Sequence, residues 1–270
     1  MSEDLIAHAL QDTAVSQFRY FDRIGSTNDE ALKWVDSGAS DFSLVIADEQ
    51  TFGRGRFDRR WITPAGASLA FSLILHPSSP DPSLIPFYSS LAAIAVHEAV
   101  ASLLGITAMI KWPNDVLIRR KKFCGILVEA AWDGNSLAGI VMGIGINVSL
   151  DSIPDKIHQN FPATCLEAEC GQRVNRWDIL HATLQSIEHW RSSLGTDALI
   201  EYWNRHLAFR NEWVRIEHSE KPSIIGKVRG IDPLGNLILD DKMGNETRIM
   251  IGDVHTRPGI EEDGRENHAG

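Results

Sequence analysis

Cysteine is scarce in this chain, and its placement excludes a disulfide scaffold. The 270 residues contain Cys124, Cys165 and Cys170, an odd number with no CxxC pair. Folds that depend on disulfides are richer in cysteine and usually carry an even number. The sequence therefore predicts free thiols, a reducing environment and a cytoplasmic location.

Basic residues and long apolar runs are also in short supply. The chain has 26 lysines and arginines against 36 acidic residues, a net charge of −10. A protein that binds nucleic acid over a broad surface needs the opposite balance, so we expect no nucleic-acid partner. No run approaches the ~18 apolar residues of a membrane helix, and the acidic N-terminus is unlike a signal peptide. We therefore expect no membrane partner.

Several catalytic signatures are missing. The sequence has no GxxxxGK[ST] phosphate loop and no GxSxG nucleophile elbow. The VHEAV stretch (Val96–Val100) lacks the second histidine of an HExxH zinc helix, and the ten histidines show no ligand spacing. We expect no permanently bound metal or cofactor.

The first 208 residues mix helix and strand patterns, which is typical of an α+β domain. Ser26 or Thr27 can cap a short helix that ends before Gly38. The stretch Ser136–Val148 is nearly all apolar and should be the central strand. The other expected strands are 43–50, 68–76, 107–113 and 123–132, and the other expected helices are 84–104, 176–194 and 196–207.

The pattern changes after Leu207. Short β runs follow, separated by the turn signals SEKP, DPLG and DKMGN, and they predict a small barrel or sheet. We expect one domain over residues 1–208, a small β domain over 209–258 and a polar, disordered tail over 259–270.

A cationic loop stands out in this acidic chain. The stretch QTFGRGRFDRRW (Gln50–Trp61) holds four arginines and two glycines. Gly53 and Gly55 permit close backbone approach, so Arg54 and Arg56 could direct forked donors at a carboxylate or phosphate. Taken alone, the loop is equally well interpreted as a solvated surface whose arginines pair with acidic neighbours.

Three further stretches lie at strand ends. KWPND (Lys111–Asp115) is typical of a β-turn, although a buried lysine there would need an anionic partner. In KKFCGILVE (Lys121–Glu129), a glycine inside a strand often marks close approach of a ligand, whereas the lysines could equally be gatekeepers at a strand end. GIGIN (Gly143–Asn147) lacks the third glycine of a dinucleotide fingerprint. Asn147 could present its amide to a base or be a satisfied core residue.

The order of these stretches resembles that of biotin protein ligases. The motifs GSTN, GRGRxxRxW, KWPND, KxxGILVE and GIGINV occur at Gly25–Asn28, Gly53–Trp61, Lys111–Asp115, Lys122–Glu129 and Gly143–Val148. The similarity runs from Phe18 to Pro258. It implies a mixed sheet with flanking helices, like that of class II aminoacyl-tRNA synthetases, followed by an SH3-like β domain. Because it begins so near Met1, we expect a monofunctional ligase that lacks an N-terminal DNA-binding domain.

The resemblance implies a two-step reaction. The biotin carboxylate attacks the α-phosphate of ATP, giving biotinyl-5′-AMP and pyrophosphate. A lysine of a biotin carboxyl carrier protein then attacks the mixed anhydride. Preorganised arginines and lysines, with Mg²⁺ that enters with ATP, would stabilise the charge on the phosphoryl oxygens. Homodimers are common among relatives, but no residue identifies one here.

The same resemblance implies roles for individual residues. Lys122 would be the key catalytic residue, with Arg56 as the principal cation and Asp115 as support for the lysine or the metal. The expected biotin-binding residues are Ser26, Thr27, Asn28, Gln50, Gly53, Arg54, Gly55, Arg56, Lys122, Gly125, Gly143 and Gly145, the last three forming a floor. The expected ATP-binding residues are Arg56, Arg59, Trp61, Lys111 and Asn147, with Trp61 and Asn147 at the adenine.

Two positions depart from the pattern common in this family. Asp58 stands where relatives often have glycine, and Phe52 where they often have alanine. Asp58 could pair with Arg59 or Arg60 and stiffen the loop. Two alternative functions are lipoate or octanoate ligation, which uses the same catalytic fold, and non-catalytic sensing of biotin adenylate. The GRGR loop and the GILVE segment favour biotin over lipoate.

Overall fold

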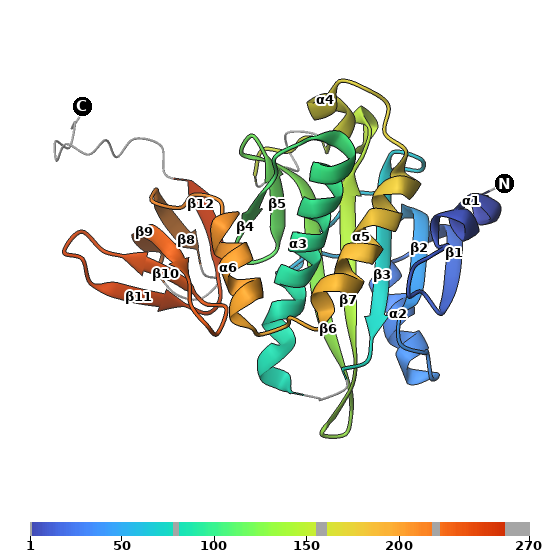
Figure 1. The fold of residues 1–270 in the computed structure, drawn as a ribbon, viewed down its shortest axis with the longest axis horizontal. Helices are drawn as coiled ribbons and strands as arrows, with labels where there is room; N and C mark the ends of the chain where they lie inside the picture. The colour runs from blue at the N-terminus through green and yellow to red at the C-terminus, as the bar shows by residue number, and fades with distance from the viewer. Residues whose placement is uncertain (1, 78–80, 155–160, 218–221, 257–270) are drawn as a thin grey trace. The chain divides into compact units, whose positions relative to one another are not determined.

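The computed structural model describes residues 2–77, 81–154, 161–217 and 222–256 (Figure 1). The chain divides into two compact units, Met1–Ala208 and Phe209–Gly270. Each unit has a sheet of its own. The segment predicted to be a disordered tail, 259–270, lies outside the described residues.

A seven-stranded mixed sheet organises the first unit, in the order β1-β2-β3-β7-β6-β5-β4. β1 and β2 run parallel, and all other neighbours are antiparallel. The middle position belongs to β7, the strand predicted to be central. The strands are β1 (Gln17–Ile24), β2 (Ser43–Gln50), β3 (Ser68–Leu75), β4 (Met109–Lys111), β5 (Asp115–Ile118), β6 (Lys121–Asp133) and β7 (Ser136–Asn147).

Alternation along β7 gives the sheet two different faces, because successive side chains of a strand point in opposite directions. One face receives the buried side chains of Ile140, Met142, Ile144 and Ile146. The other face carries Gly143 and Gly145, and Gly143 pairs with Ser72 of β3 and Leu127 of β6. The small residues leave room above the middle of the sheet on this second face.

Helices cover both faces. α2 (Thr27–Asp36) packs on the glycine-bearing face, where its Trp34 and Val35 share a core cluster with Ile74 and Val141. α3 (Ile85–Leu104) and α5 (Arg176–Arg191) lie side by side across the other face (Figure 1). The remaining helices of this unit are α1 (Ser2–Ala9), α4 (Leu166–Cys170) and α6 (Asp197–Arg205), with short 3-10 turns at η1 (Pro82–Leu84) and η2 (Leu150–Ser152).

Among the described residues, the segment Pro82–Leu104 is long and apolar enough to cross a membrane by length and composition alone. An 18-residue window of this segment has a mean hydropathy of 1.4, and 67 % of that window is buried, because the sheet and α5 cover α3. The helix ends at Gly105, whose φ of 64° suits the left-handed C-cap that its position predicted.

The sequence did not predict α1, β1, β5 or α4. The edge strand β1 reads QFRYFDRI and mixes charged with aromatic side chains, so it lacks an apolar run. β5 begins at Asp115, inside the KWPND stretch that was interpreted as a turn. The turn is confined to residues 112–114, and Asp115 then pairs with Lys111 across the β4–β5 hairpin.

The second unit is a five-stranded antiparallel sheet in the order β11-β10-β9-β8-β12. Its core includes Val214, Val228, Leu239 and Val254. Together with the mixed sheet and flanking helices of the first unit, this sheet confirms the predicted fold class. The strands are β8 (Trp213–Glu217), β9 (Ile224–Ile231), β10 (Leu237–Asp240), β11 (Glu246–Ile249) and β12 (Asp253–Thr256).

Candidate active site

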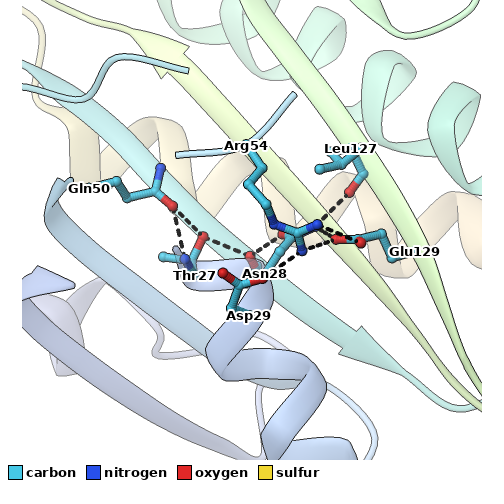
Figure 2. Close-up of polar contacts among 8 residues, drawn as sticks. Thr27, Asn28, Asp29, Gln50, Arg54, Leu127 and Glu129 are labelled. Carbon is cyan, nitrogen blue, oxygen red and sulfur yellow. Dashed lines mark hydrogen bonds and ion pairs between the residues drawn. The ribbon is translucent and has the colours of Figure 1, made fainter. Parts of the chain in front are cut away.

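The candidate site lies on the glycine-bearing face, where the N-terminus of α2 meets β3 and β6 (Figure 2). Ser26, Thr27 and Asn28 are all buried there. Burying polar side chains is costly unless they find hydrogen-bond partners. For Thr27 and Asn28 these partners come from three strands of the sheet.

Gln50, the last residue of β2, binds the start of α2. Its Oε1 accepts a hydrogen bond from the Thr27 amide (2.9 Å) and lies 3.1 Å from the Thr27 hydroxyl, while its Nε2 donates to Thr63 Oγ1 (3.1 Å). Ser26 holds the N-cap position, but its side chain makes no capping hydrogen bond. Three residues expected at the ureido head of biotin, Ser26, Thr27 and Gln50, are thus brought together.

Asn28 is held on both sides of its amide. Its Nδ2 donates to the Leu127 carbonyl (3.1 Å) and to Glu129 Oε2 (2.7 Å), and its Oδ1 lies 2.6 Å from the Ser72 hydroxyl, which donates to it. A Cβ on Gly143 would overlap Asn28 Oδ1. Asn28 itself therefore occupies the space above Gly143, which was expected to be floor for biotin.

The arginine loop is an ordered hairpin. Trp61 N–H donates to the Gly53 carbonyl (2.8 Å), Gly55 N–H to the Arg59 carbonyl (2.7 Å) and Arg59 N–H to the Arg56 carbonyl (3.2 Å). At its tip Phe57 and Asp58 have φ values of 54° and 57°, the left-handed pair of a type I′ turn. Among the described ion pairs none joins Asp58 to Arg59 or Arg60, so its contribution to the loop is the turn conformation.

The first two arginines of the hairpin point at different partners. Arg54 forms two hydrogen bonds to Glu129 (2.9 and 2.6 Å) and an ion pair with Asp29 (2.8 Å). Arg56 donates to the Asn114 side-chain carbonyl at 3.3 Å, and its guanidinium lies over the Phe57 ring. The charge of Arg54 is therefore matched by two carboxylates of the protein itself.

Two lysines share one buried carboxylate. Lys111 Nζ lies 3.0 Å from Asp115 Oδ2, and Lys122 Nζ lies 2.6 Å from Asp115 Oδ1. Burial would raise the pKa of Asp115, but the charges of Lys111 and Lys122 outweigh it and hold that pKa well below its ordinary value. Two ammonium groups and one carboxylate leave a local charge of about +1, which favours binding of an anion.

Trp61 covers the remaining glycines. A Cβ on Gly145 would overlap its indole, and one on Gly125 would meet both Trp61 and Lys122. Lys122 Nζ lies 5.3 Å from the centre of the Trp61 ring. Among the described residues, the buried Nε1 of Trp61 has no hydrogen-bond partner. The glycines, the tryptophan and the lysine expected to contact ligands therefore form one patch.

Asn147 ends β7 close to the segment that passes Lys122. Its Nδ2 donates to the Thr164 carbonyl (3.0 Å), and the Thr164 amide donates to the Lys122 carbonyl (2.9 Å). Asn147 is thus a hydrogen-bonded, buried residue at the end of the strand. Its predicted contact with adenine stays a prediction.

The sequence did not single out Ser72 or assign a role to Glu129. Ser72 is fully buried in the apolar strand SLAFSLIL, and a polar residue at such a position was the available signal. For Glu129 the available signal was an acidic residue directly after the apolar segment of a strand. Pairing across 75 residues of chain is not visible in sequence spacing.

The cysteines and the acidic residues of this unit are groups that a redox or metal site could use. The three cysteines are free, as predicted, and burial raises the pKa of the Cys124 thiol well above its ordinary value. In the part of the chain that the structure describes, no group of three or more histidine, cysteine, aspartate or glutamate side chains is placed to hold a metal ion. The positively charged groups that the structure places at the site include Lys111, Lys122 and Arg56, which can stabilise an anion electrostatically.

Comparison with known proteins agrees with this geometry. Residues 20–147 match the model of the biotin/lipoate A/B protein ligase family. The chain is 32 % identical over 236 residues to the biotin–[acetyl-CoA-carboxylase] ligase of Paracoccus denitrificans, covering 83 % of this chain and 94 % of that one. It is 33 % identical over 260 residues to the bifunctional ligase/repressor BirA of Bacillus spizizenii, covering 94 % of this chain and 78 % of that protein.

Solved structures show the same similarity. A biotin protein ligase from Aquifex aeolicus in complex with biotin and ATP is 27 % identical, with a TM-score of 0.75 over 89 % of this chain and 98 % of that one. The matched regions span the motifs from Gly25 to Val148. This chain belongs to the biotin/lipoate A/B protein ligase family.

Proposed function

We infer that this protein is an ATP-dependent biotin protein ligase. It activates biotin as biotinyl-5′-AMP and transfers it to a lysine of a biotin carboxyl carrier protein. The observation that carries this function is the identity with the ligase from Paracoccus denitrificans over 94 % of that enzyme's length. The cationic patch around Lys122, on a sheet face with Gly125 and Gly145, supports this proposal.

Adenylation brings the carboxylate of biotin against the polyanion of ATP, so positive charge is the main requirement. Lys122 supplies it at the carboxyl oxygen that becomes the bridging ester. Asp115 fixes the position of the Lys122 ammonium, and Lys111 adds a second ammonium beside it. Arg56 is the further cation of the hairpin. Mg²⁺ would enter with the ATP phosphates and neutralise them, since Asp115 is engaged by two lysines.

The site has a biotin end, near the start of α2, and a nucleotide end, near the end of β7. Thr27 and Gln50, with Ser26, take the ureido head of biotin, and Arg54, Gly53 and Gly55 of the hairpin wrap its chain. Trp61 would move aside from Gly145 or stack on the ligand. Asn147 and Arg59 belong to the nucleotide end.

The acceptor is the lysine of a carrier domain in a carboxylase, because two relatives are named for acetyl-CoA carboxylase. Three free cysteines suit a reducing cytoplasm. The unit over 209–258 would act as an SH3-like accessory to the catalytic domain over 1–208, and the enzyme would work as a monomer or homodimer.

The test is biotinylation followed by intact mass. The purified protein is incubated with Mg·ATP, a carboxyl carrier domain and either biotin, lipoate or octanoate. One added biotin on a single lysine, only when ATP is present, is the expected result. Modification by lipoate or octanoate but not biotin would keep the fold and replace the substrate. No modification and no pyrophosphate release would favour a biotin-adenylate sensor.

A further inference from the structure

The carboxylate of Glu129, in β6, joins two segments that are far apart in the sequence (Figure 2). Its Oε1 accepts from Arg54 Nη1 at 2.9 Å, and its Oε2 accepts from Arg54 Nη2 at 2.6 Å. The same Oε2 also accepts from Asn28 Nδ2 at 2.7 Å. One side chain thus holds the arginine hairpin and the N-terminus of α2 at once.

We propose that Glu129 is a positioning residue, which latches the arginine hairpin to the start of α2. Through Asn28 it also fixes the direction of the hydrogen bonds in the biotin-head pocket, which is formed by Ser26, Thr27 and Gln50. It acts through Arg54 and Asn28 and contacts no substrate itself. The effect on biotin rests on the function proposed above. The latch itself does not, because it is a contact between parts of this chain.

The first step of the argument concerns the hairpin. A planar guanidinium and a carboxylate that meet through two parallel hydrogen bonds fix an angle as well as a distance. Arg54 follows Gly53 at the base of the hairpin, so this pair sets the direction in which the hairpin leaves the sheet. Asp29 offers a single contact to Arg54, and its side chain is 48 % exposed against 26 % for Glu129. The bidentate, less exposed partner is the more restrictive one.

The second step concerns the pocket. A carboxylate can only accept hydrogen bonds, so Glu129 forces the NH₂ group of Asn28 toward itself. The carbonyl end of Asn28 then faces Ser72, whose hydroxyl hydrogen it takes. Since its single hydrogen is given to Asn28, Ser72 Oγ can only accept from the Thr27 hydroxyl, whose Oγ1 lies 2.8 Å away. The Thr27 hydroxyl hydrogen is then directed at Ser72, and the Thr27 amide keeps its hydrogen bond to Gln50 Oε1 at 2.9 Å. The orientation imposed by Glu129 is therefore passed through Asn28 and Ser72 to the Thr27 hydroxyl.

The two steps give Arg54 a structural part within the GRGR stretch. Arg54 is neutralised by Glu129 and Asp29, so it holds the loop in place.

The experiment compares Glu129→Gln with the matched control Asp29→Asn. Both variants remove one negative charge near Arg54, but only the first removes the two-point contact. The first readout is limited trypsin cleavage within the hairpin, which contains four arginines, mapped by mass in the absence of substrates. The second is biotin affinity by calorimetry, and the third is kcat and KM for adenylation.

We expect Glu129→Gln to be cut in the hairpin about tenfold faster than wild type, with biotin affinity reduced about tenfold and kcat at saturating biotin little changed. Asp29→Asn should stay within about twofold of wild type in all three readouts. In Arg54→Gln the second substitution Glu129→Gln should add little to the cleavage rate of the hairpin, because both remove the same Arg54–Glu129 contact. If Glu129→Gln does not fold, Arg54→Lys is the substitute test. It keeps the positive charge but removes the two-point guanidinium contact, so it should show the same faster cleavage.

Wild-type cleavage and biotin affinity in a folded Glu129→Gln protein would overturn the latch. So would additive effects of the Arg54 and Glu129 substitutions on hairpin cleavage. If the wild-type protein bound no biotin, the proposed function would fail instead, and the cleavage difference would still decide whether the latch exists.

Discussion

Lys122 forms an ion pair with Asp115 of the neighbouring strand. Because Asp115 is shared with Lys111, removal of Lys122 leaves the buried carboxylate paired, so the fold should survive. Lys122→Ala should therefore lower pyrophosphate release about 10²- to 10³-fold, the scale of losing one transition-state donor. The exposed neighbour Lys121 provides the control, since Lys121→Ala should keep the wild-type rate. A near-normal rate in Lys122→Ala would remove this residue from the mechanism.

His97 lies away from the site and makes the stability dependent on pH. It is buried in α3, and its Nδ1 lies 2.9 Å from the Ala108 carbonyl, which can only accept. Burial first, and then the nearby His206, lower the pKa of His97 to about 4, while the Ala108 hydrogen bond and Glu98 oppose the shift.

Between pH 4 and about 6.5 the unfolded chain binds a proton at His97 that the folded protein does not. This contribution to stability is thus complete above pH 6.5 and falls by roughly 3 kcal/mol as the pH drops to 4. Urea unfolding at several pH values should show this slope, and His97→Asn, whose amide can still donate to Ala108, should flatten it. An unchanged slope in the variant would assign the effect to other groups.

Among the elements, the arginine hairpin depends on an uncommon backbone conformation. Phe57 and Asp58 both adopt positive φ, which costs non-glycine residues about 1–2 kcal/mol and costs β-branched residues most. Asp58→Val should therefore open the hairpin and speed dissociation of the adenylate up to about tenfold, whereas Asp58→Asn should behave like wild type. Stopped-flow measurement of adenylate release would test this, and equal rates in the two variants would contradict it.

Elements with a clear apolar run or a terminating glycine could be predicted from the sequence. Elements whose position depends on contacts with distant residues could not. The apolar run of β7 and the glycine after α3 fixed a central strand and a helix end. β1 was missed because edge strands face water and lose their apolar pattern, and β5 because its first residue looked like part of a turn.

The site divides in the same way. The motif order predicted that Thr27 would meet Gln50 and Asp115 would meet Lys122, since each pair lies at strand or helix ends. It did not predict that Arg54 would bind Glu129, or that Trp61 would cover Gly145. Side-chain partners of that kind depend on register across several strands, which local sequence does not specify.

For the whole molecule, a net charge of −10 is compatible with a cationic site because Lys111 and Lys122 share a single carboxylate there. The net negative charge repels nucleic acids at long range, and the effect weakens with salt.

The two units also predict how the chain tolerates truncation. The sheet, helices and candidate site lie within residues 1–208, which have their own core. Residues 1–208 expressed alone should therefore fold cooperatively and retain biotin affinity within about threefold. Transfer to the carrier domain should fall if the second unit covers ATP or docks the acceptor. Full transfer activity would make that unit an accessory, and loss of biotin binding would contradict the separation.

The alternation along β7 has a further consequence for how the protein reaches its native state. A slip of one residue in the pairing of β7 would turn its isoleucines into the space beneath Asn28 and Trp61 and bring its glycines into the core. That arrangement would leave cavities on one side and collisions on the other. The residue pattern of the strand that forms the floor of the site therefore also selects the register of the sheet. The register that packs the core correctly is the same register that forms the site.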